Sequence, residues 1–116
     1  MDERVEKAFA VANYMATLSN QRRIILEEFT QSLVYYSNGG TFKINPELIN
    51  FTKLALDLGH DTDVPFLDAN NLPIIIPNVQ EFFDEIVALY FGQLNEYSAK
   101  YAEIKSKRKV GDIVEL

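Results

Sequence analysis

The stretch LVYYSNGGTFKINPE, residues 33–47, decides the fold. Two runs rich in β-branched and aromatic residues flank Ser37-Asn38-Gly39-Gly40, a pattern typical of a tight turn between antiparallel strands. Asn45-Pro46-Glu47 then has the composition of a helix start, with a capping Asn and Pro at the first helical position. The stretch therefore predicts a hairpin over 33–45 and a helix over 46–58, which Gly59 ends. The alternative is that the preceding helix continues through Tyr36 and stops at Gly39.

The same order of signals follows a second time. Asp68-Ala69-Asn70-Asn71 predicts a turn within a hairpin over 64–76, and Pro65 and Pro73 cannot donate to a ladder, so its strands should be edges. A shift of the sequence by 31 positions aligns the two segments as a faint ββα repeat, although apolar positions also coincide by chance. The shift places Leu33 on Val64, Tyr35 on Phe66, Ile44 on Ile75, Pro46 on Pro77, Leu48 on Val79 and Phe51 on Phe82.

Two long amphipathic segments flank this centre. Residues 2–32 lack Gly and Pro, and residues 78–108 begin with capping-box spacing at Asn78 and Glu81, so both ranges predict helices. We expect Gly92 to mark a close helix crossing. The first stripe is Val11, Met15, Leu18, Arg22, Ile25 and Phe29. The last is Val79, Phe83, Ile86, Tyr90, Leu94, Tyr97, Tyr101 and Ile104. The central helix has Leu48, Phe51, Leu54 or Ala55, and Leu58 as its apolar face.

These segments predict one mostly helical α+β domain over 1–116, in the order α-ββ-α-ββ-α, with residues 109–116 as a tail. We expect one small sheet packed against the helices, because short hairpins are not stable alone. The two long helices could pair in antiparallel orientation. The chain has no cysteine, no apolar run of membrane-spanning length and no signal-peptide pattern, so we expect a cytoplasmic protein without membrane contact.

The sequence offers little for catalysis. His60, the one histidine, lies among aspartates whose spacing matches no calcium or closed zinc site. Gly39-Gly40 lacks the following Lys-Ser/Thr of a phosphate loop, and the paired carboxylates fall on polar helix faces. We therefore predict no catalytic residues, metal, cofactor or small-molecule substrate, and a protein that is not an enzyme.

The lengths of the terminal helices favour a partner. About 30 residues span about 45 Å, which exceeds the diameter of a compact domain of this size, so part of at least one helix either bends back or projects. A projecting amphipathic helix would expose an apolar stripe. This predicts a non-enzymatic interaction, assembly or accessory protein whose partner is itself or another protein. The predicted contacts are Tyr90, Leu94, Tyr97, Tyr101 and Ile104. Simple core packing at helical spacing is the competing interpretation of these side chains.

Single-stranded nucleic acid is the alternative partner. The chain has a net charge of −6, which disfavours general binding to phosphate backbones. Its last helix nevertheless ends in a basic cluster near tyrosines that could stack on bases. The residues of this alternative site are Lys105, Lys107, Arg108 and Lys109. The same cations also complement a helix dipole, and this second explanation requires no ligand.

Several stretches carry a resemblance to known sequences. They are AVANYM at 10–15, LDANNLPIII at 67–76, VQEF at 79–82, residues 97–109 and DIV at 112–114. Together they resemble small uncharacterised proteins of contractile-tailed marine cyanophages. The resemblance implies a viral protein that acts in the cytoplasm of an infected bacterium. It implies no activity and no functional residues.

Overall fold

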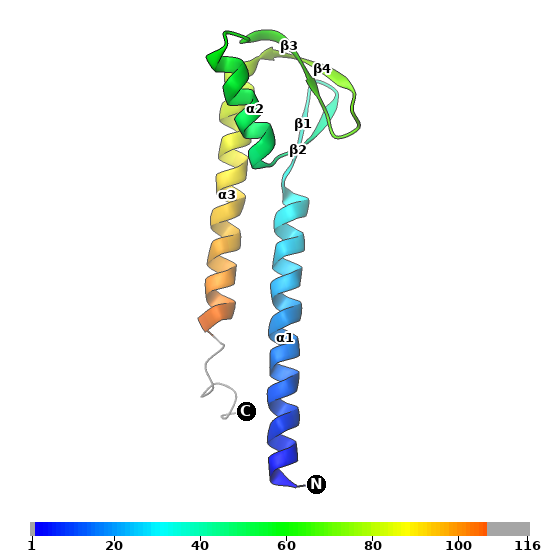
Figure 1. The fold of residues 1–116 in the computed structure, drawn as a ribbon, viewed down its shortest axis with the longest axis vertical. Coiled ribbons are helices and arrows are strands. Elements are labelled where there is room, and N and C mark those ends of the chain that lie inside the picture. The colour runs from blue at the N-terminus through cyan, green and yellow to red at the C-terminus, as the bar shows by residue number, and fades with distance from the viewer. Residues whose placement is uncertain (1, 107–116) are drawn as a thin grey trace. The chain divides into compact units, whose positions relative to one another are not determined.

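The computed structural model describes residues 2–106, and Figure 1 shows their fold. The elements follow the predicted order α-ββ-α-ββ-α and confirm the mostly helical α+β class. They are α1 (Glu3–Ser32), β1 (Val34–Ser37), β2 (Gly40–Lys43), α2 (Pro46–Asp57), β3 (Thr62–Leu67), β4 (Pro73–Asn78) and α3 (Val79–Ser106).

The first hairpin forms as predicted, and the alternative of a helix through Tyr36 is wrong. β1 and β2 pair antiparallel with Ser37 opposite Gly40, which leaves Asn38 and Gly39 as a two-residue loop. Both loop residues have positive φ, 52° and 84°, as a turn that follows the strand twist requires. This turn needs residues that tolerate left-handed backbone, and Asn-Gly supplies them.

The second hairpin is longer than the first. β3 and β4 pair antiparallel from Thr62 opposite Asn78 to Leu67 opposite Pro73. The two hairpins form separate two-stranded sheets, so the expectation of one sheet was wrong. A backbone hydrogen bond of 2.7 Å, from the N–H of Ala69 to the carbonyl of Thr41, connects the second turn to β2. Every strand is thus an edge strand, which is the position that proline tolerates.

The predicted ββα repeat holds for the order of elements and fails in detail. Ile44 is buried while its counterpart Ile75 is 52% exposed, and Phe82 is buried while its counterpart Phe51 is 52% exposed. The second hairpin has strands of six residues, whereas those of the first hairpin have four. A shift of 31 positions therefore does not superpose the two cores.

Helix α2 has both of its predicted ends. The side chain of Asn45 accepts a hydrogen bond from the Leu48 N–H at 2.8 Å, and Pro46 opens the helix. At the other end Gly59 has φ +87°, its N–H donates to Leu56, and the N–H of His60 donates to Ala55. These two bonds form a Schellman motif, which satisfies the last carbonyls.

The buried face of α2 matches the predicted one only in part: of the alternatives Leu54 and Ala55 it is Ala55 that is buried, and Leu48 is half-buried. Thr52 and Ala55 are buried, whereas Phe51, Leu54 and Leu58 are 52%, 52% and 65% exposed. Thr52 can be buried because its hydroxyl donates to the Leu48 carbonyl at 2.7 Å. Helical periodicity identified the apolar side chains, but the most buried positions lie on a neighbouring strip of the helix.

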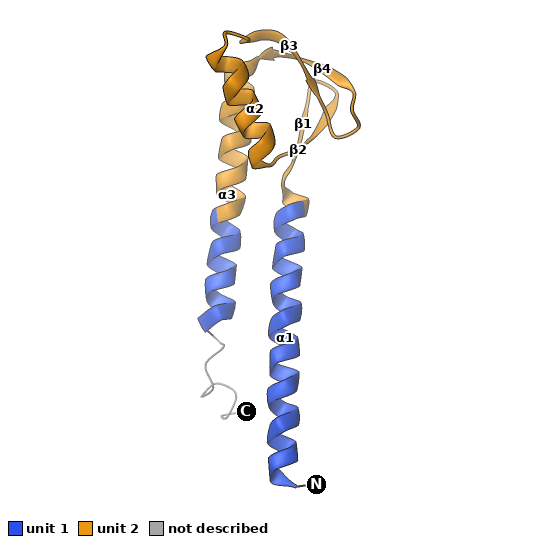
Figure 2. Ribbon diagram, in the orientation of Figure 1, with its two compact units in different colours: residues 1–30, 95–116 blue, residues 31–94 orange. Residues whose placement is uncertain are grey.

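The chain divides into two compact units (Figure 2). Unit 1 comprises residues 1–30 and 95–116, and unit 2 comprises residues 31–94, so α1 and α3 contribute to both. In unit 1 the ring centroid of Phe29 lies 5.1 Å from that of Tyr97, and Arg22 lies over the ring of Tyr101. A later position on α1 thus contacts an earlier position on α3, and the reverse, which confirms antiparallel pairing within this unit.

The core of unit 2 is centred on Phe82 of α3. Its ring contacts Tyr35 of β1, Phe42 of β2 and Phe66 of β3, with centroids 5.9, 5.1 and 5.4 Å away. The buried aliphatic residues around this cluster are Leu33, Ile44, Ile76, Val79 and Ile86. One side chain therefore joins both hairpins to the last helix.

Gly92 of α3 does not mark a helix crossing, contrary to the prediction. A Cβ placed on Gly92 would meet no atom within 4 Å.

Among the described residues, no helix combines the length and apolar character that crossing a bilayer requires.

Candidate functional site

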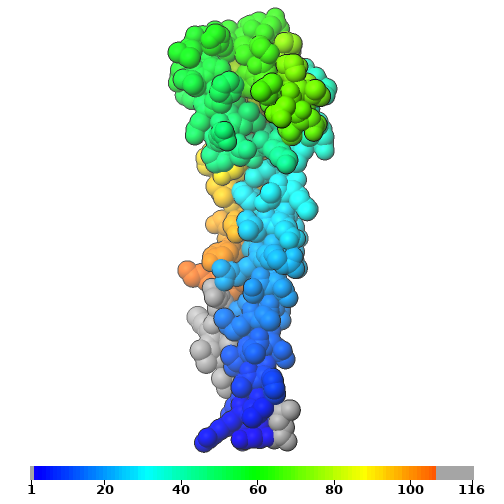
Figure 3. Space-filling model, turned by 45° about the vertical axis from the view of Figure 1, so that its right-hand side comes forward, coloured from blue at the N-terminus to red at the C-terminus, as the bar shows by residue number. Residues whose placement is uncertain are grey.

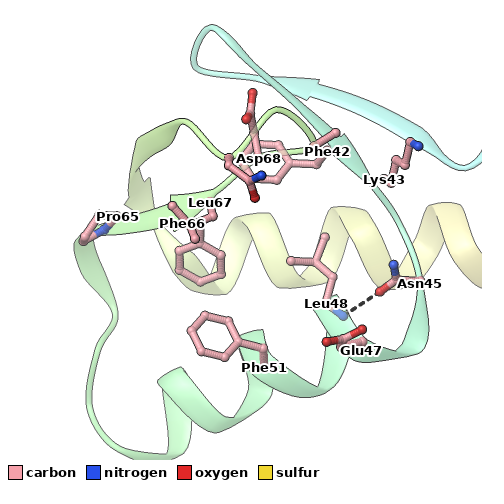
Figure 4. A pocket seen from close by; sticks show the side chains of 12 residues that line it. Phe42, Lys43, Asn45, Glu47, Leu48, Phe51, Pro65, Phe66, Leu67 and Asp68 are labelled. Carbon is pink, nitrogen blue, oxygen red and sulfur yellow. Dashed lines mark hydrogen bonds between the residues drawn. The ribbon is translucent and has the colours of Figure 1, made fainter.

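An apolar groove of about 640 Å³ opens on unit 2 (Figure 4). It lies among β2, the start of α2, β3 and the turn after β3. Its lining residues are Phe42, Lys43, Asn45, Glu47, Leu48, Phe51, Pro65, Phe66, Leu67, Asp68, Ala69 and Asn71. The volume falls in the range of protein sites that hold a small ligand or an anchoring side chain.

Aromatic rings form the floor and one wall of this groove. Phe42 and Phe66 are each 1% exposed, so their positions are fixed by the core of unit 2. Phe51 packs edge-on against Phe66 with ring centroids 5.5 Å apart, as the facing rings in Figure 4 show, yet remains 52% exposed. A ligand that covers Phe51 would therefore meet a rigid aromatic surface.

Leucines extend the apolar surface beyond the groove. Leu67 of β3 lines the groove and is 64% exposed. Leu54 of α2 and Leu58, the residue that caps its C-terminus, lie on the side of the helix that carries Phe51. Large apolar side chains grouped in this way on a folded surface usually mark a binding site. We call Phe51, Leu54, Leu58 and Leu67, with the groove, the aromatic groove surface.

The ionisable groups of the groove differ in their surroundings. Lys43 and Glu47 are exposed on its rim, and no ion pair is recorded for either within residues 2–106. Asp68 is buried, and its carboxylate accepts backbone N–H bonds from Leu72, Asn70 and Thr41 at 2.9, 2.9 and 3.2 Å. Asp68 thus joins the β3–β4 turn to β2, and its oxygens are engaged in structure.

Asp68 should make unit 2 sensitive to acid. The N–H of Leu72, followed by those of Thr41 and Asn70, lowers the pKa of this carboxyl below its ordinary value of 3.8, against the opposing effect of burial. Because the folded pKa lies below the unfolded value, the stabilisation is present above pH 3.8 and is lost as the pH falls through the folded pKa.

Urea unfolding between pH 2 and 7, followed by circular dichroism, measures this effect. Asp68→Asn should lower stability at neutral pH and flatten the loss below about pH 4, because an amide offers one acceptor oxygen and turns its NH₂ toward a backbone donor. Asp63→Asn, the same change of charge on the same hairpin, is the control variant. An Asp68→Asn protein with the wild-type slope would contradict the assignment.

The five predicted partner contacts fall in both units. Tyr90 and Leu94 lie in unit 2 and are half-buried, with the Tyr90 ring edge-on to Phe91 at 5.7 Å. Tyr97, Tyr101 and Ile104 lie in unit 1, where the first two contact Phe29 and Arg22 of α1 and Ile104 is 8% exposed. Much of their surface is thus used within the chain, and their contact with a partner stays a prediction.

The predicted nucleic-acid site lies mostly outside the described residues. Lys105 is exposed in the last turn of α3, and Lys107, Arg108 and Lys109 fall beyond residue 106. Lys100 is the basic residue that precedes Lys105 in the sequence, and it is paired with Glu28 at 3.2 Å and Glu96 at 3.3 Å. Hydrogen bonds to these two carboxylates raise the pKa of Lys100. The positive charge of Lys100 therefore stabilises the pairing of the helices in unit 1.

Sequence reasoning missed the aromatic groove surface. Its residues come from positions 42 to 71 and meet only after both hairpins fold. A signal was present in α2, where periodicity predicts Leu48, Phe51, Leu54 or Ala55, and Leu58 as the core face. Thr52 is the buried position that this prediction leaves out, and beside Ala55 it fits a close approach between elements.

The groove is lined by side chains that suit contact with an apolar group, and its lining contains no Ser, Thr, Tyr, His or Cys that could act as a nucleophile or neutral base. Groups of three or more potential metal ligands are also absent from the described part of the chain.

No protein-family model, curated protein or solved structure matches the chain.

Proposed function

We propose that the chain is a non-enzymatic protein-interaction module that binds a partner segment on the aromatic groove surface of unit 2. The observation that carries the proposal is the exposure of Phe51, Leu54, Leu58 and Leu67, each more than half exposed, beside a groove with an aromatic floor. Removing such side chains from water is the main favourable term in protein association. A bulky apolar side chain of the partner would occupy the groove.

The charge of unit 2 favours a basic partner. Residues 31–94 contain eight Asp and Glu against two Lys, which gives this unit the whole net charge of −6. An acidic surface increases the encounter rate with a cationic segment and disfavours an anionic one. Glu47 on the rim can pair with a lysine or arginine next to the anchoring side chain. The expected partner is therefore an amphipathic segment with apolar and basic residues.

A labelled amphipathic peptide of leucine and lysine provides the direct test by fluorescence anisotropy. Two leucines of the second hairpin form a matched pair, since Leu67 lines the groove and Leu72 does not, with exposures of 64% and 53%. We expect Leu67→Ser to weaken binding by about tenfold, the effect of losing one central apolar contact. Leu72→Ser should keep the affinity within about twofold.

The controls separate groove binding from general attraction between charges. The same peptide with glutamate in place of each lysine should bind much more weakly, because its charge has the sign of unit 2. Equal weakening by the two serine variants would show that the groove is not the site. Absence of peptide binding to the wild-type chain at low salt would overturn the proposal.

A further inference from the structure

The first half of α1 exposes apolar side chains within unit 1. Val5, Phe9, Val11 and Met15 are 40%, 56%, 42% and 45% exposed. Figure 3 shows this part of α1, in blue, on the molecular surface. The feature is separate from the aromatic groove surface, which belongs to unit 2.

Val5, Phe9 and Met15 lie about 60° to 180° around the helix from Leu18, whereas Val11 lies about 20° from Leu18, on the stripe that also carries Phe29. At 100° per residue, Leu18, Ile25 and Phe29 share one direction, and they are the buried or half-buried positions that face α3. A second face, centred about 120° around the helix from that direction, combines large and small residues at alternating three- and four-residue spacing. We call it the outer face of α1; its residues are Val5, Ala8, Phe9, Ala12, Met15, Ala16 and Ser19.

The outer face is suited to close packing against another helix. Ala8, Ala12 and Ala16 are exposed and follow one another at intervals of four residues, so the backbone can approach a neighbouring helix closely. Phe9 and Met15 flank this strip and can insert between the side chains of the neighbour. Helices that pack through alternating three- and four-residue spacing bury such positions as knobs in holes.

The distribution of charge indicates a second copy of the chain as the neighbour. Residues 8–21 form 14 consecutive positions without Asp, Glu, Lys, Arg or His, about 21 Å of helix at 1.5 Å per residue. Unit 1 contains nine acidic and nine basic residues and is neutral, whereas unit 2 carries −6. Two identical chains repel wherever their acidic units approach, and this uncharged face allows contact without that penalty.

We infer that two copies of the chain associate through the outer faces of their α1 helices, around Ala12. The contact is isologous, because the same patch serves both copies. The inference is independent of the aromatic groove surface, since it uses an uncharged helix face in a different unit. A dimer formed in this way carries two grooves.

Two alanines two residues apart provide the matched test. Ala12 lies on the outer face, whereas Ala10 is exposed and points about 160° away from Ala12 around the helix. Sedimentation equilibrium should show wild-type chain at twice 13.3 kDa. Ala12→Glu should raise the dimer dissociation constant by at least about tenfold, because it places two carboxylates in an apolar contact. Ala10→Glu, with the same change of charge, should leave it unchanged.

Cysteine substitution gives a second readout that does not depend on a destabilising charge. The chain contains no cysteine, so Ala12→Cys introduces a single thiol, which should form a disulfide-linked dimer under mild oxidation. Ala10→Cys should remain monomeric on a denaturing gel. Circular dichroism verifies that each variant keeps its helices, and Leu67→Ser should leave the dimer mass unchanged.

Two results would overturn the inference. One is a wild-type chain that sediments at 13.3 kDa at every concentration up to the millimolar range. The other is equal dissociation by Ala12→Glu and Ala10→Glu, or equal cross-linking of the two cysteine variants. Either result leaves peptide binding by the groove unaffected, so the two proposals fail separately.

Discussion

Replacement of Phe82 by alanine should destabilise the protein by about 3–5 kcal/mol, the usual cost of removing a buried aromatic ring. Phe82 is 3% exposed and its ring contacts Tyr35, Phe42 and Phe66, so the change removes the centre of the core of unit 2. A domain of this size is stable by about 5–15 kcal/mol, and the loss is therefore a large part of the total.

Urea unfolding monitored by circular dichroism measures this loss, with Phe91→Ala as the control. Phe91 lies on the same helix, in the same unit, and is 53% exposed, so its replacement should cost less than about 1 kcal/mol. The Phe82→Ala variant should also lose peptide binding, because Phe42 and Phe66, which form the floor of the groove, pack against this ring. Similar unfolding midpoints for the two variants would contradict the assignment of the core.

Alanine at Gly40 and alanine at Gly92 should shift stability in opposite directions. A Cβ on Gly40 would lie 2.5 Å from Cγ1 of Ile74 and 3.1 Å from the Phe42 ring, so the Ile74 side chain or the second hairpin would have to shift. Overpacking of this kind costs about 1–3 kcal/mol. A Cβ on Gly92 meets nothing, and alanine inside a helix is favoured over glycine by about 0.5–1 kcal/mol.

Thermal unfolding of both variants beside the wild type provides the measurement. Because both variants replace a glycine by alanine, the difference between their unfolding temperatures reports only on the surroundings of each glycine. A Gly40→Ala protein as stable as the wild type would show that the hairpins do not pack as closely as described. A destabilised Gly92→Ala protein would indicate a contact on that side of α3.

The sequence predicted the parts of the fold that depend on local chemistry. Asn38-Gly39 provides left-handed backbone, Asn45-Pro46 caps and opens α2, and Gly59 ends it, and each signal acts within a few residues. The order of elements and the bounds of α1 followed from such signals together with helical periodicity. These features are confirmed because no distant contact is needed to produce them.

Features that depend on distant contacts were predicted less well. The hairpins form two sheets instead of one, and the exposed face of α2 includes Phe51, which periodicity assigned to the core. Periodicity identifies apolar positions without showing which neighbouring face a tertiary contact will cover. The groove between Phe42, Phe51 and Phe66 was missed for the same reason, since it exists only after the hairpins and α2 have come together.

Unit 1 is built from segments that the ribosome makes far apart in time. Phe29 meets Tyr97, so the first helix leaves the exit tunnel 68 residues before the ring that packs on it. At about 5–20 residues per second, that interval lasts roughly 3–14 seconds. Unit 2, whose residues are contiguous, can fold during this delay. Unit 2 can therefore fold first, while the apolar side chains of α1 in unit 1 remain without their partners on α3 until that segment has been synthesised.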